Sequence, residues 1–199
     1  MSDLEGSDLD LTEEPVREPE DRRSPDNVLA ADLARDARSF LETLDAVASG
    51  EAGTQGVALL LLDVARICVA GAHLGAMTDI VLESNVEPAL EDPPDVDALR
   101  EGLARELGPV DAYVEVFDPY ADDAAVPYTL SDDLADIALD LLHGLRHYDA
   151  GRSREALWWW QFTCLNSWGN HAGASLRALQ SLVAHVRLDA GRELVPTEV

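Results

Sequence analysis

The chain has 199 residues, and its 39 acidic residues outnumber its 14 basic residues so strongly that the formal net charge at pH 7 is −25. Every basic residue is an arginine, which excludes catalysis through a lysine Schiff base and a phosphate-binding loop that depends on lysine. The negative charge argues against direct binding of nucleic acid, whose affinity comes largely from neutralised phosphates, and it predicts repulsion from anionic membranes.

The charge pattern divides the chain into a tail and one domain. Residues 1–23 are polar and lack aromatic side chains, which predicts a disordered acidic tail. Residues 24–189 carry the apolar periodicity of a helical domain, and residues 190–199 are expected to fray. Residues 141–199 hold six arginines and five acidic residues, a net charge of +1, so an acidic body should pack against a nearly neutral C-terminal part.

Two helices are predicted at the start of the domain. Ser24 and Pro25 supply an N-cap and a first-turn proline for a helix over residues 26–49, which Gly50 ends. A second helix, about residues 54–75, is apolar on nearly all sides and is therefore expected to be buried.

That second helix carries two opposite charges. Asp63 and Arg66 are three residues apart, a spacing that places both side chains on one face. A structural ion pair is the main interpretation, and membership of a functional site is the alternative.

The middle of the chain is predicted to contain two short helices. Asp95 caps a helix that runs to Leu107, and the dipeptide Gly108-Pro109 ends it and starts another. The acidic connector that follows, through Asp123, lacks the ligand spacing of a calcium loop. The apolar stripe of the second short helix consists of Val110, Tyr113, Val114 and Phe117.

The next helix begins after Thr129 or Ser131 as its cap and closes at Gly151. Its apolar stripe is formed by Leu134, Ile137, Ala138, Leu141, Leu145 and Tyr148. The opposite side carries a row of acidic and histidine side chains at helical spacing: Asp136, Asp140, His143 and His147.

This row has two interpretations. The spacing of Asp140 and His143 is the one that helical bundles use for half of a dinuclear iron site, and His73 or His171 could add a ligand from another helix. The sequence offers no convincing second pair, so no metal and no cofactor are expected. In the favoured interpretation, Asp136 or Asp140 forms an ion pair with Arg177 across a helix interface.

All four tryptophans fall within residues 157–168, which follow a candidate N-cap at Ser153. On a helical wheel the apolar side chains of this stretch cover about 200° of the circumference, which predicts the central helix of a bundle, with Trp160 and Trp168 buried. The residues of this apolar sector are Leu157, Trp158, Trp160, Phe162, Cys164, Leu165 and Trp168. Gly169 and Gly173 mark a kink or a break before the last amphipathic helix.

Trp159 lies outside that apolar sector, beside Thr163 and Asn166. These three residues are a candidate interface, because exposed tryptophans often anchor contacts. The contact would be with another helix of the same chain or with a second protein, including a second copy of the chain.

Cysteine usage and hydropathy suggest the compartment. Cys68 and Cys164 both lie in apolar helical stretches, which favours buried free thiols in a reducing cytoplasm over a disulfide. The acidic N-terminus does not resemble a signal peptide, and the longest uncharged runs are shorter than the ~20 residues that span a bilayer. A cytoplasmic location without membrane insertion is expected.

Several short motifs together resemble a known family. They are Leu-Ala-Asp-Ile-Ala-Leu-Asp-Leu at 134–141, Val-Phe-Asp-Pro at 116–119, Trp-Gly at 168–169 and Leu-Arg-Ala-Leu-Gln at 176–180. Over about residues 30–189 the chain resembles an uncharacterised bacterial family, domain of unknown function 5063. Its pattern is matched at Asp136, Asp140, Trp168, Gly169 and Arg177.

His143 and His147 depart from the family pattern, which lowers the metal interpretation further. The resemblance implies a helical domain and brings no known activity with it. At most it suggests a DNA-maintenance partner.

The sequence therefore predicts an all-α, single bundle-like domain of five or six helices without a β-sheet. The favoured function is a non-enzymatic cytoplasmic interaction or adaptor protein that binds a protein partner or forms a homodimer. The alternatives are a metal-dependent enzyme that uses the Asp–His row, and an acidic protein that competes with nucleic acid for a basic DNA-maintenance partner.

Overall fold

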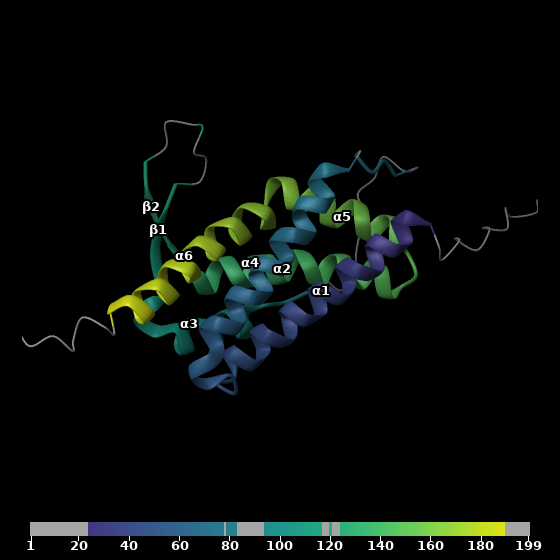
Figure 1. The fold of residues 1–199 in the computed structure, drawn as a ribbon. Helices are drawn as coiled ribbons and strands as arrows, with labels where there is room; N and C mark the ends of the chain where they lie inside the picture. Colours follow the sequence, from purple (N-terminus) through teal and green to yellow (C-terminus); the bar gives the residue numbers. More distant parts are fainter. Residues whose placement is uncertain (1–23, 78, 83–93, 117–119, 121–123, 190–199) are drawn as a thin grey trace, which may run out of the picture.

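The computed structural model describes residues 24–77, 79–82, 94–116, 120 and 124–189 (Figure 1). The predicted tail (1–23) and the predicted frayed end (190–199) lie outside these residues. The described chain forms six α-helices, two short 3₁₀ helices and one two-stranded sheet: α1 (Pro25–Ala48), η1 (Gly53–Gln55), α2 (Gly56–Ala76), α3 (Asp97–Leu107), η2 (Gly108–Val110), β1 (Ala112–Glu115), β2 (Val126–Thr129), α4 (Leu130–Asp149), α5 (Ser153–Asn166) and α6 (Trp168–Asp189).

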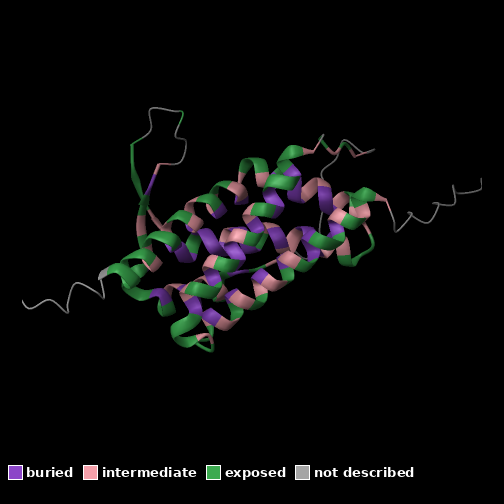
Figure 2. Ribbon diagram, in the orientation of Figure 1, coloured by how far each residue is buried: buried purple, intermediate pink, exposed green. Residues whose placement is uncertain are grey.

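The helices form one bundle, which confirms the predicted all-α class (Figure 1). α4 contacts α1, α3, α5 and α6, and α2 packs against α1, α5 and α6. Figure 2 shows the buried residues on the faces that these helices turn toward one another. The hairpin of β1 and β2 stands beside α6 and extends away from the bundle (Figure 1).

Local sequence signals set the starts of α1 and α4 as predicted. The Ser24 hydroxyl accepts a hydrogen bond from the Asn27 N–H at 3.2 Å, ahead of Pro25. The hydroxyl of Thr129, the N-cap of α4, accepts one from the Asp132 N–H at 3.4 Å. Asp95 caps the start of α3 as predicted, because its carboxylate accepts a hydrogen bond from the Asp97 N–H at 3.0 Å, although Val96 is the residue directly before the helix. The cap predicted for α5 is wrong, because Arg152 rather than Ser153 precedes it.

The tryptophan-rich α5 contacts four helices: α1, α2, α4 and α6. Trp160 and Trp168 are fully buried, as predicted. Phe162 and Leu165 were expected to be buried, but they are 48% and 62% exposed. The buried arc is therefore narrower than the apolar arc, because the neighbouring helices leave one side of α5 uncovered.

Three indole N–H groups fix α5 and the turn after it. Trp159 donates to the Asp140 carbonyl at 3.1 Å, and Trp160 donates to the Leu141 carbonyl at 3.2 Å. Trp168 donates to the Trp160 carbonyl at 3.1 Å. Buried indole N–H groups require such partners, so each tryptophan ties a helix to a main-chain acceptor.

The helix breaks at Ser167, between α5 and α6 and before the predicted Gly169. Gly169 is still required, because a Cβ there would lie 2.2 Å from the Cys164 carbonyl oxygen. The turn thus brings two backbones closer together than any side chain allows.

The prediction for residues 109–117 is wrong. This segment forms η2 and then β1, which pairs antiparallel with β2 from Ala112 opposite Thr129 to Glu115 opposite Val126. Its aromatic and β-branched residues favour a strand once a partner strand is present. The prediction that the chain has no sheet is corrected accordingly, and Phe117 lies outside the described residues.

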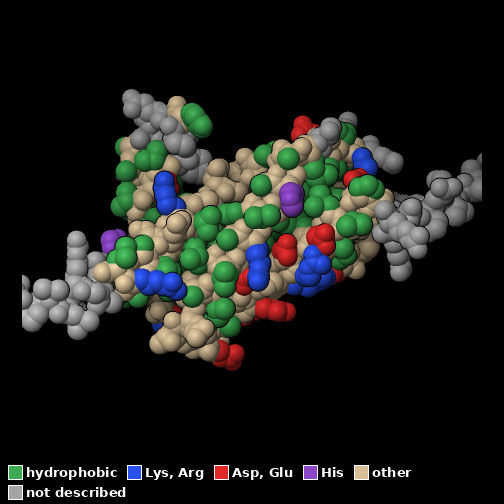
Figure 3. All heavy atoms as spheres, in the orientation of Figure 1, with side chains coloured by type: hydrophobic (Ala, Val, Ile, Leu, Met, Phe, Trp, Pro, Cys, Tyr) green, Lys and Arg blue, Asp and Glu red, His purple; other side chains and the backbone are tan. Residues whose placement is uncertain are grey.

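The described residues contain one helix, Gly53–Ala76, that is long and apolar enough to cross a membrane by length and composition. Its mean hydropathy is 1.9, and 39% of the most apolar window is buried within the bundle. The exposed side of this helix carries Leu62 and Val69. Figure 3 shows hydrophobic side chains over α2 and the hairpin, with charges of both signs gathered along α1.

Gly144 allows α5 to approach α4 closely. A Cβ at Gly144 would lie 2.0 Å from Nε1 of Trp160, whose rigid indole is fully buried. Most helical glycines cost stability relative to alanine, so this position exchanges helix propensity for close packing.

Gly144→Ala should lower the free energy of unfolding by about 1–3 kcal/mol, because the added methyl group must displace the Trp160 indole. The matched control is Gly173→Ala in α6, where a Cβ meets nothing within 4 Å. The control should raise stability by about 0.5–1 kcal/mol. Urea unfolding measures both changes, and a gain in stability for Gly144→Ala would contradict the close α4–α5 contact.

Candidate functional site

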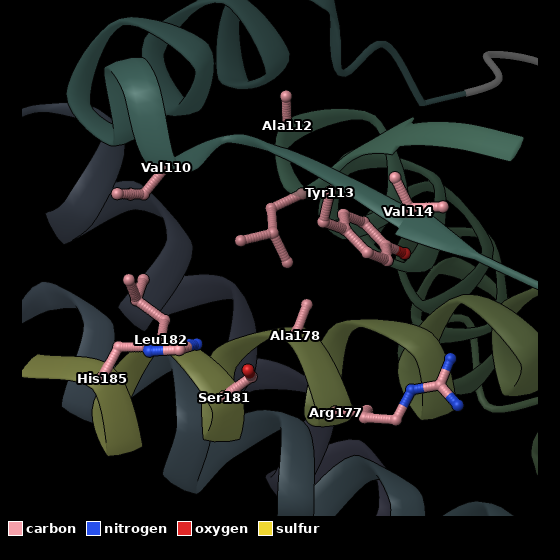
Figure 4. Close-up of a pocket in the computed structure, with 10 residues that line it drawn as sticks. Val110, Ala112, Tyr113, Val114, Arg177, Ala178, Ser181, Leu182 and His185 are labelled. Carbon is pink, nitrogen blue, oxygen red and sulfur yellow. The ribbon is translucent and has the colours of Figure 1, made fainter. Parts of the chain in front are cut away.

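Two adjoining cavities separate β1 from α6, and together they are called the hairpin groove. The first, about 440 Å³, is mainly apolar; Figure 4 shows Ala178 of α6 pointing across it toward β1 and Leu182 pointing toward Val110. The second, about 300 Å³, lies beside the first half of α6; its lining is also mainly apolar, but several charged side chains stand at its wall, and it is called the polar cavity for them. Tyr113 and Arg177 line both cavities and mark their junction.

The two linings differ in chemistry. The apolar cavity is lined by Val110, Ala112, Tyr113, Val114, Leu130, Arg177, Ala178, Ser181, Leu182 and His185. The polar cavity is lined by Tyr113, Glu115, Val116, Tyr128, Asp133, Gly169, Asn170, His171, Gly173, Ala174 and Arg177.

Asp111 fixes the base of the hairpin to the start of α4. Its carboxylate accepts hydrogen bonds from the Ser131 N–H and the Ser131 hydroxyl, both at 2.8 Å, and its carbonyl accepts one from the Leu130 N–H at 2.9 Å. The Tyr113 and Tyr128 rings face each other across the two strands with centroids 6.2 Å apart. The hairpin therefore leaves the bundle in a defined direction.

Asp133 joins three elements in the polar cavity. It lies in the first turn of α4, is 2% exposed, and accepts hydrogen bonds from the Tyr113 hydroxyl of β1 and from Nδ1 of His171 in α6. The His171 contact is 2.8 Å. A buried carboxylate needs such donors to offset its lost hydration, so this contact network holds β1 and α6 together.

The contacts around Asp133 change the pKa values of its two hydrogen-bond donors, His171 and Tyr113. The hydrogen bond to Asp133 raises the pKa of His171, and the nearby carboxylates of Asp133, Asp136 and Asp140 add to the rise. Burial, followed by the bond to Asp133, raises the pKa of Tyr113. Tyr113 is therefore a neutral hydroxyl donor, and His171 takes up a proton more readily than a free histidine.

Glu115 and Arg177 form the second ion pair of the polar cavity. Glu115 is 8% exposed, and its carboxylate accepts hydrogen bonds from the Arg177 guanidinium and from the Val116 N–H. The Arg177 side chain is 67% exposed. The predicted pairing of Arg177 with Asp136 or Asp140 is therefore wrong, because β1 places a buried carboxylate in front of Arg177.

The predicted Asp–His row is divided among different partners. Asp136 pairs at 2.9 Å with Arg100 of α3, which also contacts Asp132 at 2.8 Å. Burial raises the pKa of Asp140, while a hydrogen bond from Ser167 opposes that rise.

The two histidines of the row lie against α5. The His143 ring stacks on Trp159 with a centroid distance of 3.5 Å. His147 is fully buried with Nδ1 3.1 Å from Glu155, and burial lowers its pKa. Within the described ranges, no group of three or more His, Cys, Asp or Glu side chains is placed to hold a metal ion.

Asp63 and Arg66 form the predicted ion pair. Asp63 is 5% exposed and also accepts a hydrogen bond from the Thr43 hydroxyl of α1. This pair therefore joins α2 to α1, away from the hairpin groove.

The side of α5 that carries Trp159 contacts α4 of the same chain. Trp159 is half-buried between its stacking contact with His143 and its hydrogen bond to the Asp140 carbonyl. Thr163 is 4% exposed and donates its hydroxyl hydrogen bond to the Trp159 carbonyl, so its predicted place in an interface with a second protein is wrong. Asn166 is exposed.

Cys68 and Cys164 are free and partly buried. Burial raises the pKa of the Cys164 thiol to about 11 and also raises that of Cys68. Both thiols are therefore protonated near neutral pH, which makes them poor nucleophiles.

Sequence reasoning missed most of the groove. Tyr113 was assigned to a helix stripe, and His171 was considered only as an added metal ligand, while Glu115 and Asp133 drew no attention. Asp133 lies 38 residues from His171 and 20 from Tyr113, so no local spacing joins them. The available signal was the strand propensity of residues 112–115.

The raised pKa of His171 predicts a pH dependence of stability. The unfolded value is about 6.5, so the folded state holds a proton that the unfolded state releases above that pH. The stabilisation is fully present below about pH 6.5 and is lost as the pH rises through the folded value. His147, with its lowered pKa, removes stability only as the pH falls below about 6.5.

The free energy of unfolding should therefore fall as the pH rises from about 6.5 through the raised pKa of His171, and His171→Gln should flatten this part of the profile. Urea unfolding at a series of pH values measures both. An unchanged slope in His171→Gln would show that the Asp133–His171 contact contributes nothing.

Comparisons with known proteins agree with this fold. The model of the family described as domain of unknown function (DUF5063) matches residues 26–185. The chain is similar in structure to protein BF1032 from Bacteroides fragilis, with 21% sequence identity, a TM-score of 0.61, and coverage of 81% of this chain and 94% of that one. That likeness shows a shared fold, and the comparison with curated proteins gave no match. Since the family model spans most of the domain, the chain belongs to the DUF5063 family.

Proposed function

We propose that this chain is a non-enzymatic interaction protein that binds a segment of a partner protein in the hairpin groove. The observation that carries the proposal is the groove itself, in which an apolar and a polar cavity adjoin beneath a projecting hairpin. Concave surfaces with apolar walls and a few convergent polar groups are the usual form of binding sites.

The shape of the groove favours an extended segment. Side chains of such a segment can enter the two cavities in turn, since both follow α6 and share Tyr113 and Arg177. Among the described residues β1 pairs only with β2, so the two-stranded sheet offers its outer edges to an added strand.

The polar residues of the groove support binding over catalysis. Asp133 and Glu115 are each held in a fixed contact with a basic side chain. The nearby Asp–His row is divided among α3, α5 and the start of α6, which supports a structural role for it. The proposed setting is the cytoplasm, supported by the two free thiols.

The net charge of −25 favours a second candidate, an acidic protein that competes with nucleic acid for a basic partner. That function would use the acidic surface rather than the groove. Its affinity should fall steeply as salt rises, because exposed charges attract through a screened field.

The test selects peptides from a displayed random library on the full chain and measures their affinities by fluorescence anisotropy. Ser181→Trp fills the apolar cavity from an exposed position that lines it. The control, Gln180→Trp, places the same side chain at the preceding position, which is exposed and outside the groove. We expect Ser181→Trp to weaken binding at least about tenfold and Gln180→Trp to leave it unchanged.

Peptides that bind Ser181→Trp as tightly as the natural chain would contradict the proposal. If those peptides are basic and lose affinity steeply with salt, the competitor function is the better account. The unfolding midpoints of both tryptophan variants serve as the folding control.

A further inference from the structure

The two carboxylates of the polar cavity are buried, and each is paired with a basic side chain. Asp133 and Glu115, 2% and 8% exposed, accept hydrogen bonds from Tyr113, His171, Arg177 and the Val116 N–H. An incoming cation would have to replace a donor in one of these buried contacts. Breaking a buried pair leaves an uncompensated charge, so the cavity is a poor cation site.

The basic partners lie on the outer side of these contacts. The side chain of Arg177 is 67% exposed and that of His171 is 22% exposed, while their carboxylate partners are at most 9% exposed. The basic end of each contact is therefore the more accessible one, although both carboxylates also line the cavity. A guanidinium has five N–H donors, and a histidine that donates through Nδ1 keeps Nε2 on the other side of its ring.

We infer that the polar cavity binds a carboxylate side chain of the partner segment, so the groove selects an acidic residue close to an apolar one. This inference rests on the proposed function and specifies the chemistry of the segment. Arg177 lines both cavities, so the carboxylate and the apolar side chain belong to nearby residues of one segment. Charge-assisted hydrogen bonds to Arg177 and His171 supply the selectivity.

The net charge of the chain opposes this ligand at long range, and the carboxylates of Asp136 and Asp140 oppose it near His171. Fields from exposed charges decay over about 8 Å at physiological salt, so groups within the groove decide the contact. Residues 141–199, which include all of α6, carry a net charge of +1. Raising salt should therefore leave the affinity for an acidic segment unchanged or increase it, the opposite of the behaviour of a basic partner.

The probes are short peptides of the form acetyl-Leu-(Gly)n-Glu-amide with zero to two glycines, with Gln and Arg analogues in place of Glu. Binding to the isotope-labelled full chain is followed by NMR, which reports separately on the Arg177 and His171 side chains. We expect the best Glu peptide to bind at least about tenfold more tightly than its Gln analogue, with the Arg analogue weakest. The same probe with Gly in place of Leu should bind weakly.

The matched variant is Glu115→Gln combined with Arg177→Gln, which removes both charges of the pair without leaving a buried carboxylate unpaired. It should lower the preference for Glu over Gln at least severalfold, and the preference that remains is the part that His171 supplies. Arg187→Gln, at an exposed position of α6 outside the groove, should keep the preference for Glu.

Equal binding of Glu and Gln peptides to the natural chain, or tighter binding of the Arg peptide, would overturn the carboxylate inference. If Ser181→Trp still abolishes that binding, the groove remains the binding site and only its selectivity is misassigned. Library peptides that occupy the groove without an acidic residue would likewise overturn this inference alone. If Ser181→Trp leaves all peptide binding intact, both proposals fail.

Discussion

The close contact between Gly144 and Trp160 is the constraint on which the rest of the structure depends. The absence of a side chain at Gly144 brings α5 against α4, and the indole N–H of Trp160 bonds to the α4 main chain. Trp168 then bonds back to the Trp160 carbonyl, which fixes the turn at Ser167 and the start of α6. The position of α6, and therefore one wall of the hairpin groove, follows from packing in the core.

Polar contacts then position the opposite wall. Asp111 attaches the base of the hairpin to α4, while Asp133 receives hydrogen bonds from both β1 and α6. Buried charges of this kind add little net stability, because desolvation offsets their attraction. Their effect here is to specify where a short, otherwise marginal two-stranded sheet lies.

The parts of the fold that local periodicity determines were predictable from sequence. The starts of α1 and α4 follow from Ser24 and Thr129, and the burial of Trp160 and Trp168 follows from the apolar sector of α5. The exposure of Leu165 did not follow, because a helical wheel shows which side is apolar and does not show how much of it other helices cover.

The groove depends on contacts between distant residues, and these could not be predicted. Charge balance indicated that Arg177 needs an acidic partner, but it could not distinguish Asp136 from Glu115, which lies 62 residues away on an unrecognised strand. Once β1 was assigned to a helix, Tyr113 was placed on a helical face that does not exist, and Glu115 was not considered. The strand pairing that places them spans a connector without periodicity of its own.

The measurement that tests the central claim most directly is an NMR titration of the His171 ring in the natural chain and in Gly144→Ala. If core packing positions α6, the natural chain should give a pKa above the ordinary histidine value of about 6.5, owing to Asp133. In the folded Gly144→Ala variant the displaced indole should shift α6 and move that pKa back toward about 6.5. An unchanged pKa in a variant that is folded but less stable would contradict the dependence of the groove on the Gly144–Trp160 contact.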